Sequence, residues 1–128
     1  MIKYAIIGAG WRSEFYLRIA ALLPDTFKVS GIYIRNPEKQ VEFAEKYNVK
    51  ILTSLNELLN TDFDFIVSCV NKTGICDTVK ELSSKNIPLL TETPIGTSLS
   101  EIDAFLSEIK SDWRVQVAEQ FHFMQRNA

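Results

Sequence analysis

A short glycine-containing segment has the residue types and spacing best suited to chemistry. Residues 8–13 read Gly-Ala-Gly-Trp-Arg-Ser and directly follow the apolar run Tyr4–Ile7. A tight turn from a strand into a helix favours a glycine at position 8. A bare Gly10 would let backbone N–H groups approach a diphosphate closely. A helix that begins there offers free N–H donors and the positive end of its dipole, so the segment predicts an anion-binding site.

The segment departs from the full dinucleotide-binding fingerprint at its third glycine, which Ser13 replaces. Serine is small but not ideal where a helix and a strand must pack closely. Trp11 and Arg12 adjoin the glycines and are predicted to contact the same ligand, with Arg12 either adding positive charge near the phosphates or pointing to solvent. The alternative of a purely structural glycine turn is disfavoured, because the pair falls at the first strand-to-helix junction of an alternating chain.

The end of the second predicted strand bears on which dinucleotide would bind. A domain selective for NAD usually carries an acidic residue there, which bonds the adenosine ribose hydroxyls. Ile34 takes the position that we assign to that residue, and Arg35 follows. Isoleucine accepts no hydrogen bond, whereas a guanidinium can pair with a 2′-phosphate and stack on adenine. The sequence therefore favours NADP over NAD, with a solvated loop role for Arg35 as an equal alternative.

Short apolar runs alternate with amphipathic stretches along the chain, which predicts an α/β fold of the Rossmann type. We expect a doubly wound, mostly parallel sheet of about six strands, with five crossover helices on both faces. The strands are expected at residues 2–7, 27–34, 49–52, 63–69, 87–90 and 114–118. The helices are expected at residues 14–23, 37–47, after Ser54, 73–85 and 99–109.

Local signals mark the helix ends and the faces that the helices bury. Asn36, Ser54 and Ser98 are predicted caps, the last two as capping boxes with a Glu three residues later. Two helices carry apolar residues that are expected to face the core, and these are Phe15, Leu17, Ile19, Leu22 and Leu23 in the first and Val41, Phe43, Ala44 and Tyr47 in the second.

Composition excludes several classes of function. The 128 residues carry a formal net charge of -2 with acids and bases interspersed, which gives no basic surface for nucleic acid or anionic lipid. No leader precedes the first strand and no apolar run approaches about 18 residues, so a cytoplasmic protein without a membrane span is expected. Cys69 and Cys76 are expected to be reduced thiols, Cys69 a buried one, and no metal site is predicted. The lone His122 is expected to pack rather than to ligate.

Four segments together resemble one known family. They are residues 6–12 (Ile-Ile-Gly-Ala-Gly-Trp-Arg), 35–39 (Arg-Asn-Pro-Glu-Lys), 92–94 (Glu-Thr-Pro) and 118–123 (Ala-Glu-Gln-Phe-His-Phe). In this order they are similar to the N-terminal domain of the glucose-fructose oxidoreductase, inositol dehydrogenase and rhizopine-catabolism family (Gfo/Idh/MocA). The resemblance spans nearly all of the chain and implies an NAD(P)-dependent oxidoreductase.

The resemblance also implies roles for particular residues. The family has a Glu-Lys-Pro motif after the fifth strand, whose Lys orients substrate or transfers a proton; here Thr93 replaces the Lys. A threonine hydroxyl cannot act as a general acid near neutral pH, so the catalytic residue stays unassigned. Glu92 and Pro94 match the motif and, like Asn71 and Gln120, are implied to lie near the cofactor. A loop role that only satisfies backbone groups remains the alternative for Asn71 and Gln120.

The resemblance further implies a domain arrangement and an activity. Residues 1–120 would form the dinucleotide-binding domain, and residues 121–128 would begin the connection to an absent C-terminal domain that supplies the substrate pocket and an oligomer interface. The whole protein would transfer a hydride between nicotinamide and a small hydroxy or oxo substrate, such as a sugar or polyol, while this fragment alone would bind cofactor without turnover. The alternative is a nucleotide-sensing or partner-binding module without catalysis.

Overall fold

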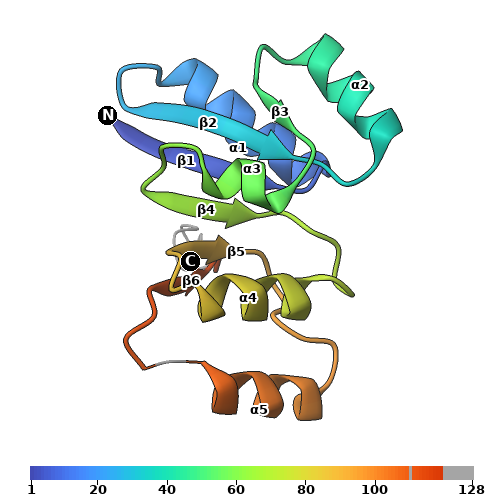
Figure 1. The fold of residues 1–128 in the computed structure, drawn as a ribbon, viewed down its shortest axis with the longest axis vertical. Helices are drawn as coiled ribbons and strands as arrows, with labels where there is room; N and C mark the ends of the chain where they lie inside the picture. The colour runs from blue at the N-terminus through green and yellow to red at the C-terminus, as the bar shows by residue number, and fades with distance from the viewer. Residues whose placement is uncertain (110, 120–128) are drawn as a thin grey trace, which may run out of the picture.

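The chain folds into a parallel sheet covered by helices on both faces (Figure 1). The computed structural model describes residues 1–109 and 111–119, and in these it contains six strands and five helices. The strands are β1 (Ile2–Ile7), β2 (Phe27–Tyr33), β3 (Ile51–Leu52), β4 (Phe65–Ser68), β5 (Leu89–Thr91) and β6 (Val115–Val117). The helices are α1 (Trp11–Leu22), α2 (Pro37–Lys46), α3 (Leu55–Leu59), α4 (Ile75–Ser84) and α5 (Leu99–Glu108). The predicted doubly wound α/β fold is confirmed.

The strand order places a topological switch point at the centre of the sheet. The order is β3-β2-β1-β4-β5-β6, and every pair of neighbours is parallel. The chain runs outward from β1 to β3, then crosses back and runs outward again from β4 to β6. In such sheets the loops after β1 and β4 diverge to opposite faces, and ligands bind in the crevice between them at the carboxyl ends of the strands.

Strand periodicity divides the core into two layers. Side chains of β1 alternate between the faces, because successive residues of a strand point in opposite directions. Tyr4 and Ile6 pack with residues of α1 and α2 on one face, including Leu17 and Phe43. On the other face Ala5 and Ile7 lie in the cluster that α3, α4 and α5 cover, whose members include Leu58, Val79, Leu82 and Phe105. The sheet is therefore buried on both sides, as parallel sheets require.

The helix caps form where the sequence predicts them. The Asn36 side chain accepts hydrogen bonds from two backbone N–H groups at the start of α2, and the Ser54 and Ser98 hydroxyls each accept one at the starts of α3 and α5. Helix α1 begins at Trp11, three residues earlier than predicted, so Gly10 is its N-cap. Strand β3 is shorter than expected, and pairing with β2 is limited to Ile51 and Leu52.

The predicted apolar faces of α1 and α2 are partly wrong. In α1 only Ser13 and Leu17 are buried, while Phe15, Leu22 and Leu23 are 44%, 79% and 50% exposed. Ser13 and Leu17 face the sheet, and Tyr16 and Ala20 pack against the same core cluster, so Phe15 and Leu22 lie on the outer side of the helix. In α2 only Phe43 is buried, and Val41 is 59% exposed; Ala44 is exposed as well. Among the described residues, no helix is both long and apolar enough to cross a membrane.

Candidate functional site

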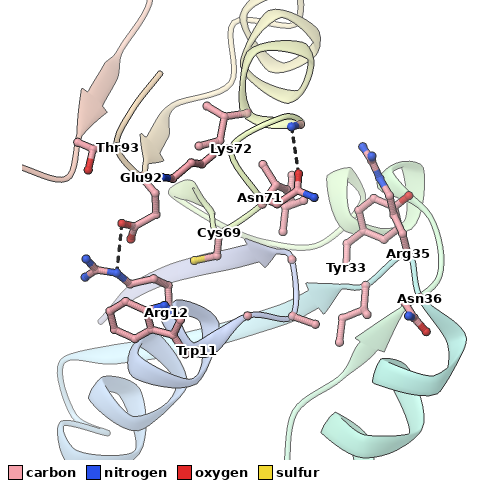
Figure 2. A pocket seen from close by; sticks show the side chains of 18 residues that line it. Trp11, Arg12, Tyr33, Arg35, Asn36, Cys69, Asn71, Lys72, Glu92 and Thr93 are labelled. Atoms are coloured by element: carbon pink, nitrogen blue, oxygen red, sulfur yellow. Dashed lines mark hydrogen bonds and ion pairs between the residues drawn. The ribbon is translucent and has the colours of Figure 1, made fainter. Parts of the chain in front are cut away.

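A cavity of about 590 Å³ opens at the carboxyl ends of the strands (Figure 2). The loops after β1, β2, β4 and β5 form its walls, which is the position that the switch point predicts. The residues that line it include Gly8, Gly10, Trp11, Arg12, Tyr33, Arg35, Cys69, Asn71, Lys72, Glu92 and Thr93. The structure thus brings together most of the candidate residues, although they come from four separate parts of the chain.

The turn after β1 requires glycine at its first position. Gly8 has a φ of +108°, and a Cβ placed there would lie 2.5 Å from the Cys69 carbonyl oxygen. Its N–H donates to the Tyr33 carbonyl oxygen at 2.9 Å, which ties the turn to the end of β2. At Gly10 the nearest atom to such a Cβ, outside its chain neighbours, is the Cys69 carbonyl oxygen at 3.9 Å, so a Cβ would fit there without a clash. Gly8 shapes the turn, and Gly10 leaves its cavity side open.

The N-terminus of α1 differs from those of α2, α3 and α5. Those three helices begin with an Asn or Ser side chain that accepts hydrogen bonds from the first turn. Helix α1 has Gly10 as its N-cap, which has no side chain to accept them, and its first residues line the cavity. Helix α4 also lacks a side-chain cap, because its N-cap is Gly74. The first N–H groups of a helix and its positive dipole end favour an anion at this position.

Ser13 fills the place of the missing third glycine without separating the helix from the sheet. It is fully buried, and its hydroxyl donates to the Gly8 carbonyl oxygen at 2.8 Å. The hydroxyl therefore has a hydrogen-bond partner, and the bond holds the first turn of α1 against the glycine turn. The departure from the fingerprint is accommodated locally.

Arg12 lines the cavity and forms an ion pair with Glu92, which lines it as well. Its Nε is 3.4 Å from Glu92 Oε2, and its guanidinium carbon lies 4.2 Å from the centre of the Trp11 ring (Figure 2). The Tyr16 hydroxyl is 3.5 Å from the other oxygen of Glu92. Burial raises the pKa of Tyr16, with the Glu92 carboxylate adding to the effect, so this phenol stays protonated at neutral pH. Glu92 itself is 7% exposed.

Cys69 lies at the floor of the cavity and is chemically quiet. It is 8% exposed, and burial raises the pKa of its thiol to about 12. Because the thiolate is the reactive form, this environment does not suit a nucleophile. Both cysteines are free, and Cys69 is buried as the sequence predicts; Cys76 is buried as well. Within residues 1–109 and 111–119, no three His, Cys, Asp or Glu side chains come together in a way that could hold a metal ion.

At the end of β2 the first exposed side chain is Arg35, not residue 34. Ile34 borders the cavity but is 1% exposed and packs in the core with Phe43, and its carbonyl oxygen accepts from Gln40 Nε2 at 2.7 Å. Tyr33 lines the cavity from the other side of the strand (Figure 2). The strand alternation therefore turns Ile34 away from a ligand, and Arg35 is exposed beside Tyr33.

The loops after β4 and β5 carry the remaining candidates. Asn71 Oδ1 accepts from the Gly74 N–H at 3.0 Å and from the Thr73 hydroxyl at 3.1 Å, so its carbonyl side closes the turn before α4. In Figure 2 the Lys72 side chain extends from this loop toward Glu92. Thr93 lines the cavity and is joined to Pro94 by a cis peptide bond, while Pro94 is not among the lining residues. Gln120 and His122 lie outside the residues that the structure describes.

Sequence reasoning missed Tyr33 and Lys72. Neither residue type points to a ligand by itself, and neither belongs to a motif. Their one signal is position, because each lies at or just after the carboxyl end of a strand next to the switch point.

Comparisons with known proteins agree with this geometry. A family model described as "Oxidoreductase family, NAD-binding Rossmann fold" matches residues 2–119. The chain is 27% identical over 114 residues to scyllo-inositol 2-dehydrogenase (NADP(+)) IolU of Bacillus subtilis, covering 88% of this chain and 34% of that protein. It is 30% identical over 115 residues to L-aspartate dehydrogenase of Methanococcus maripaludis, covering 86% of this chain and 41% of that protein. The chain thus spans between about a third and two fifths of the length of these relatives.

Solved structures share the fold at lower sequence identity. A probable dehydrogenase from Thermotoga maritima superposes with a TM-score of 0.80 at 18% identity, over 95% of this chain and 37% of that chain. The WlbA dehydrogenase from Bordetella pertussis, solved in complex with NADH and UDP-GlcNAcA, superposes with a TM-score of 0.74 at 17% identity, over 91% of this chain and 36% of that one.

Proposed function

The chain belongs to the Gfo/Idh/MocA oxidoreductase family, and from this premise we propose that its cavity binds a nicotinamide dinucleotide through the glycine turn after β1. The diphosphate lies over Gly10 and the first turn of α1. The adenosine half extends toward Arg35 at the end of β2, and the nicotinamide half extends toward the ends of β4 and β5.

The residues present fit such a ligand. The open space beside Gly10 admits phosphate oxygens, and the N-terminus of α1 supplies backbone donors that no cap side chain occupies. The cavity of about 590 Å³ lies within the usual range for ligand sites. The observation that carries the proposal is this uncapped helix N-terminus directly behind the Gly8 turn.

We further propose a preference for NADP over NAD. The residues of the β2 end that line the cavity are Tyr33, Ile34, Arg35 and Asn36, and they include no carboxylate that could bond ribose hydroxyls. The Asn36 side chain is engaged in capping α2. Arg35 is exposed and can pair with a 2′-phosphate through its guanidinium. The name of the Bacillus subtilis relative also gives NADP(+) as its cofactor.

In a complete enzyme the bound nicotinamide would accept or donate the hydride, and this domain would orient it. The substrate class that we propose is a small hydroxy or oxo compound of the sugar or polyol type, in keeping with the inositol dehydrogenase relative. Thr93 stands where the family carries its lysine and transfers no proton near neutral pH. We therefore expect the 128-residue chain to bind cofactor without turnover. The family match does not favour the alternative of a nucleotide-sensing module without catalysis.

Trp11 allows a direct test of cofactor binding. Trp11 is 68% exposed and lines the cavity, whereas Trp113 is 6% exposed and lies in the same core cluster as residues of α4 and α5. Titration with NADPH should quench the tryptophan emission in a saturable way, and a Trp11→Phe variant should show a smaller change while calorimetry still detects binding. The proposal fails if neither method detects saturable binding of NADPH or NADH to the unmodified chain.

A further inference from the structure

Buried Glu92 forms an ion pair with half-buried Arg12 beside the cavity. The binding of a diphosphate does not explain why a carboxylate lies there. Glu92 Oε2 lies 3.4 Å from Arg12 Nε, and the two side chains are 9% and 26% exposed. The Tyr16 hydroxyl contacts Glu92 at 3.5 Å, and the Trp11 ring lies under the Arg12 guanidinium. The two charges come from α1 and from the loop after β5, and both residues line the cavity.

The ion pair lies at one end of the cavity. If the diphosphate lies over Gly10 and the adenosine half lies near Arg35, the opposite half of the dinucleotide must extend toward β4 and β5, where Glu92 is found (Figure 2). This step rests on the proposed function. Among the described residues that line the cavity, the charged side chains at this end are Arg12, Lys72 and Glu92.

The nicotinamide is the part of the ligand whose charge changes in the reaction. The ring carries a positive charge when oxidised and none when reduced, whereas the phosphates, riboses and adenine are the same in both states. Charges held in a partly dry site act more strongly than they would in water. A carboxylate at this end therefore favours the oxidised form, and a guanidinium or ammonium favours the reduced form.

We propose that the Glu92–Arg12 ion pair sets the relative affinity of this domain for the oxidised and the reduced nicotinamide cofactor. Glu92 offsets the positive charges of Arg12 and Lys72, and so it permits the cationic ring to bind beside them. Arg12 in turn prevents the buried carboxylate from holding the oxidised form too tightly. Tyr16 donates a neutral hydrogen bond to Glu92 and adds no charge.

The ratio of two dissociation constants tests this proposal directly. Calorimetry with NADP+ and with NADPH, on the same protein, gives a ratio in which contacts to the unchanged parts of the ligand cancel. Glu92→Gln should weaken NADP+ relative to NADPH on the order of fivefold, and Arg12→Gln should shift the ratio by a similar factor in the opposite direction. A tenfold change in the ratio corresponds to about 30 mV in the potential of the bound two-electron couple.

Matched variants separate charge from structure. Arg12→Lys keeps the positive charge and should retain the ratio of the unmodified protein, and the double variant Arg12→Gln/Glu92→Gln should return close to it. Glu14 lies on the same helix as Arg12, pairs with Lys46 and does not line the cavity. Glu14→Gln should therefore leave the ratio of the two dissociation constants unchanged. If Glu92→Gln does not fold, the contrast between Arg12→Gln, which should shift the ratio, and Arg12→Lys, which should not, still decides the question.

Three outcomes would overturn the inference. Ratios that stay within twofold of the unmodified protein in both single variants would show that these charges do not act on the ring. A shift in the same direction in both variants would indicate a loosened site rather than an effect of charge. Failure of the unmodified chain to bind either NADP+ or NADPH would refute the proposed function itself, and would be distinguished from the other two by the absence of any binding heat.

Discussion

Gly8 lies directly against the backbone carbonyl of Cys69, so that a Cβ on Gly8 would come within 2.5 Å of the Cys69 oxygen. The contact joins the loop after β1 to the loop after β4, which are the two loops that diverge at the switch point. The Cys69 N–H also donates to the Ile7 carbonyl oxygen at 2.8 Å. The close approach fixes the floor of the cavity and leaves the next glycine, Gly10, open to a ligand.

The two glycines should respond differently to alanine. Gly8→Ala adds a methyl group where there is no space and forces it into a φ of +108°, so we expect the free energy of unfolding to fall by more than about 2 kcal/mol. Gly10→Ala meets no atom closer than 3.9 Å and should change stability by less than about 1 kcal/mol, while weakening dinucleotide affinity. Urea unfolding and calorimetry measure the two effects. Equal destabilisation by both substitutions would contradict the assigned roles.

Arg35 should determine the preference between cofactors. Arg35→Ala removes the exposed guanidinium at the end of β2, so NADPH affinity should fall by roughly tenfold or more while NADH affinity changes little. Lys28→Ala is the matched control, because Lys28 is an exposed cation near the beginning of the same strand, away from the cavity. Equal affinities for NADPH and NADH that Arg35→Ala leaves unchanged would remove the NADP preference.

The capping box at the start of α5 should give a pH-dependent contribution to stability. Glu101 Oε2 accepts from the Thr97 N–H at 2.6 Å and from its hydroxyl at 2.9 Å, and these bonds lower the pKa of Glu101. A pKa that is lower in the folded state stabilises the fold above the unfolded value of about 4.3, and this contribution is lost as pH falls through the folded value.

We therefore expect Glu101→Gln to lower the urea midpoint at pH 7, and we expect this effect to become smaller as the pH falls through the folded pKa of Glu101, where the native glutamate becomes neutral as well. Asp103→Asn removes an exposed carboxylate from the same helix and serves as the control. A Glu101→Gln effect that stays the same size as the pH falls from 7 into the acid range would show that the charge of the carboxylate does not contribute.

The thiols should be protected in the folded protein. Burial raises the pKa of Cys69 to about 12, and it raises the pKa of Cys76 as well. Since the thiolate is the species that reacts, a disulfide reagent at pH 8 should label neither cysteine until the fold opens. The labelling rate should increase in urea in parallel with the unfolded fraction. Rapid labelling of one thiol per chain in native buffer would contradict the buried position of that cysteine.

Local signals in the sequence were sufficient for the fold and for the position of the glycine turn after β1. The caps at Asn36, Ser54 and Ser98 lie within a few residues of the helices that they begin, so the pattern alone locates them. The alternation of apolar runs with amphipathic stretches predicts the parallel sheet, and the same alternation places Gly8 and Gly10 directly after the carboxyl end of β1. These features need no knowledge of long-range packing.

The other end of the site depends on contacts that the sequence does not display. Arg12 and Glu92 are 80 positions apart, and the adjacency of β1, β4 and β5 brings them together. The sequence therefore predicts either a phosphate contact or a solvent-exposed position for Arg12, and not the ion pair with Glu92. The exposure of Phe15 and Leu22 has a similar origin. The face of α1 that is buried depends on how closely Ser13 packs on the Gly8 turn, and not on apolar periodicity alone.

Amide chemical shifts during a titration with NADPH test the central claim most directly, because each backbone N–H reports its own position. We expect the largest changes at Gly10, Trp11 and Arg12 at the start of α1, with a second group at Arg35, and we expect all of them to saturate together. Changes confined to other surfaces, such as the groove that Phe65, Leu90 and Val115 line, would contradict it, as would a spectrum that NADPH and NADH both leave unaltered.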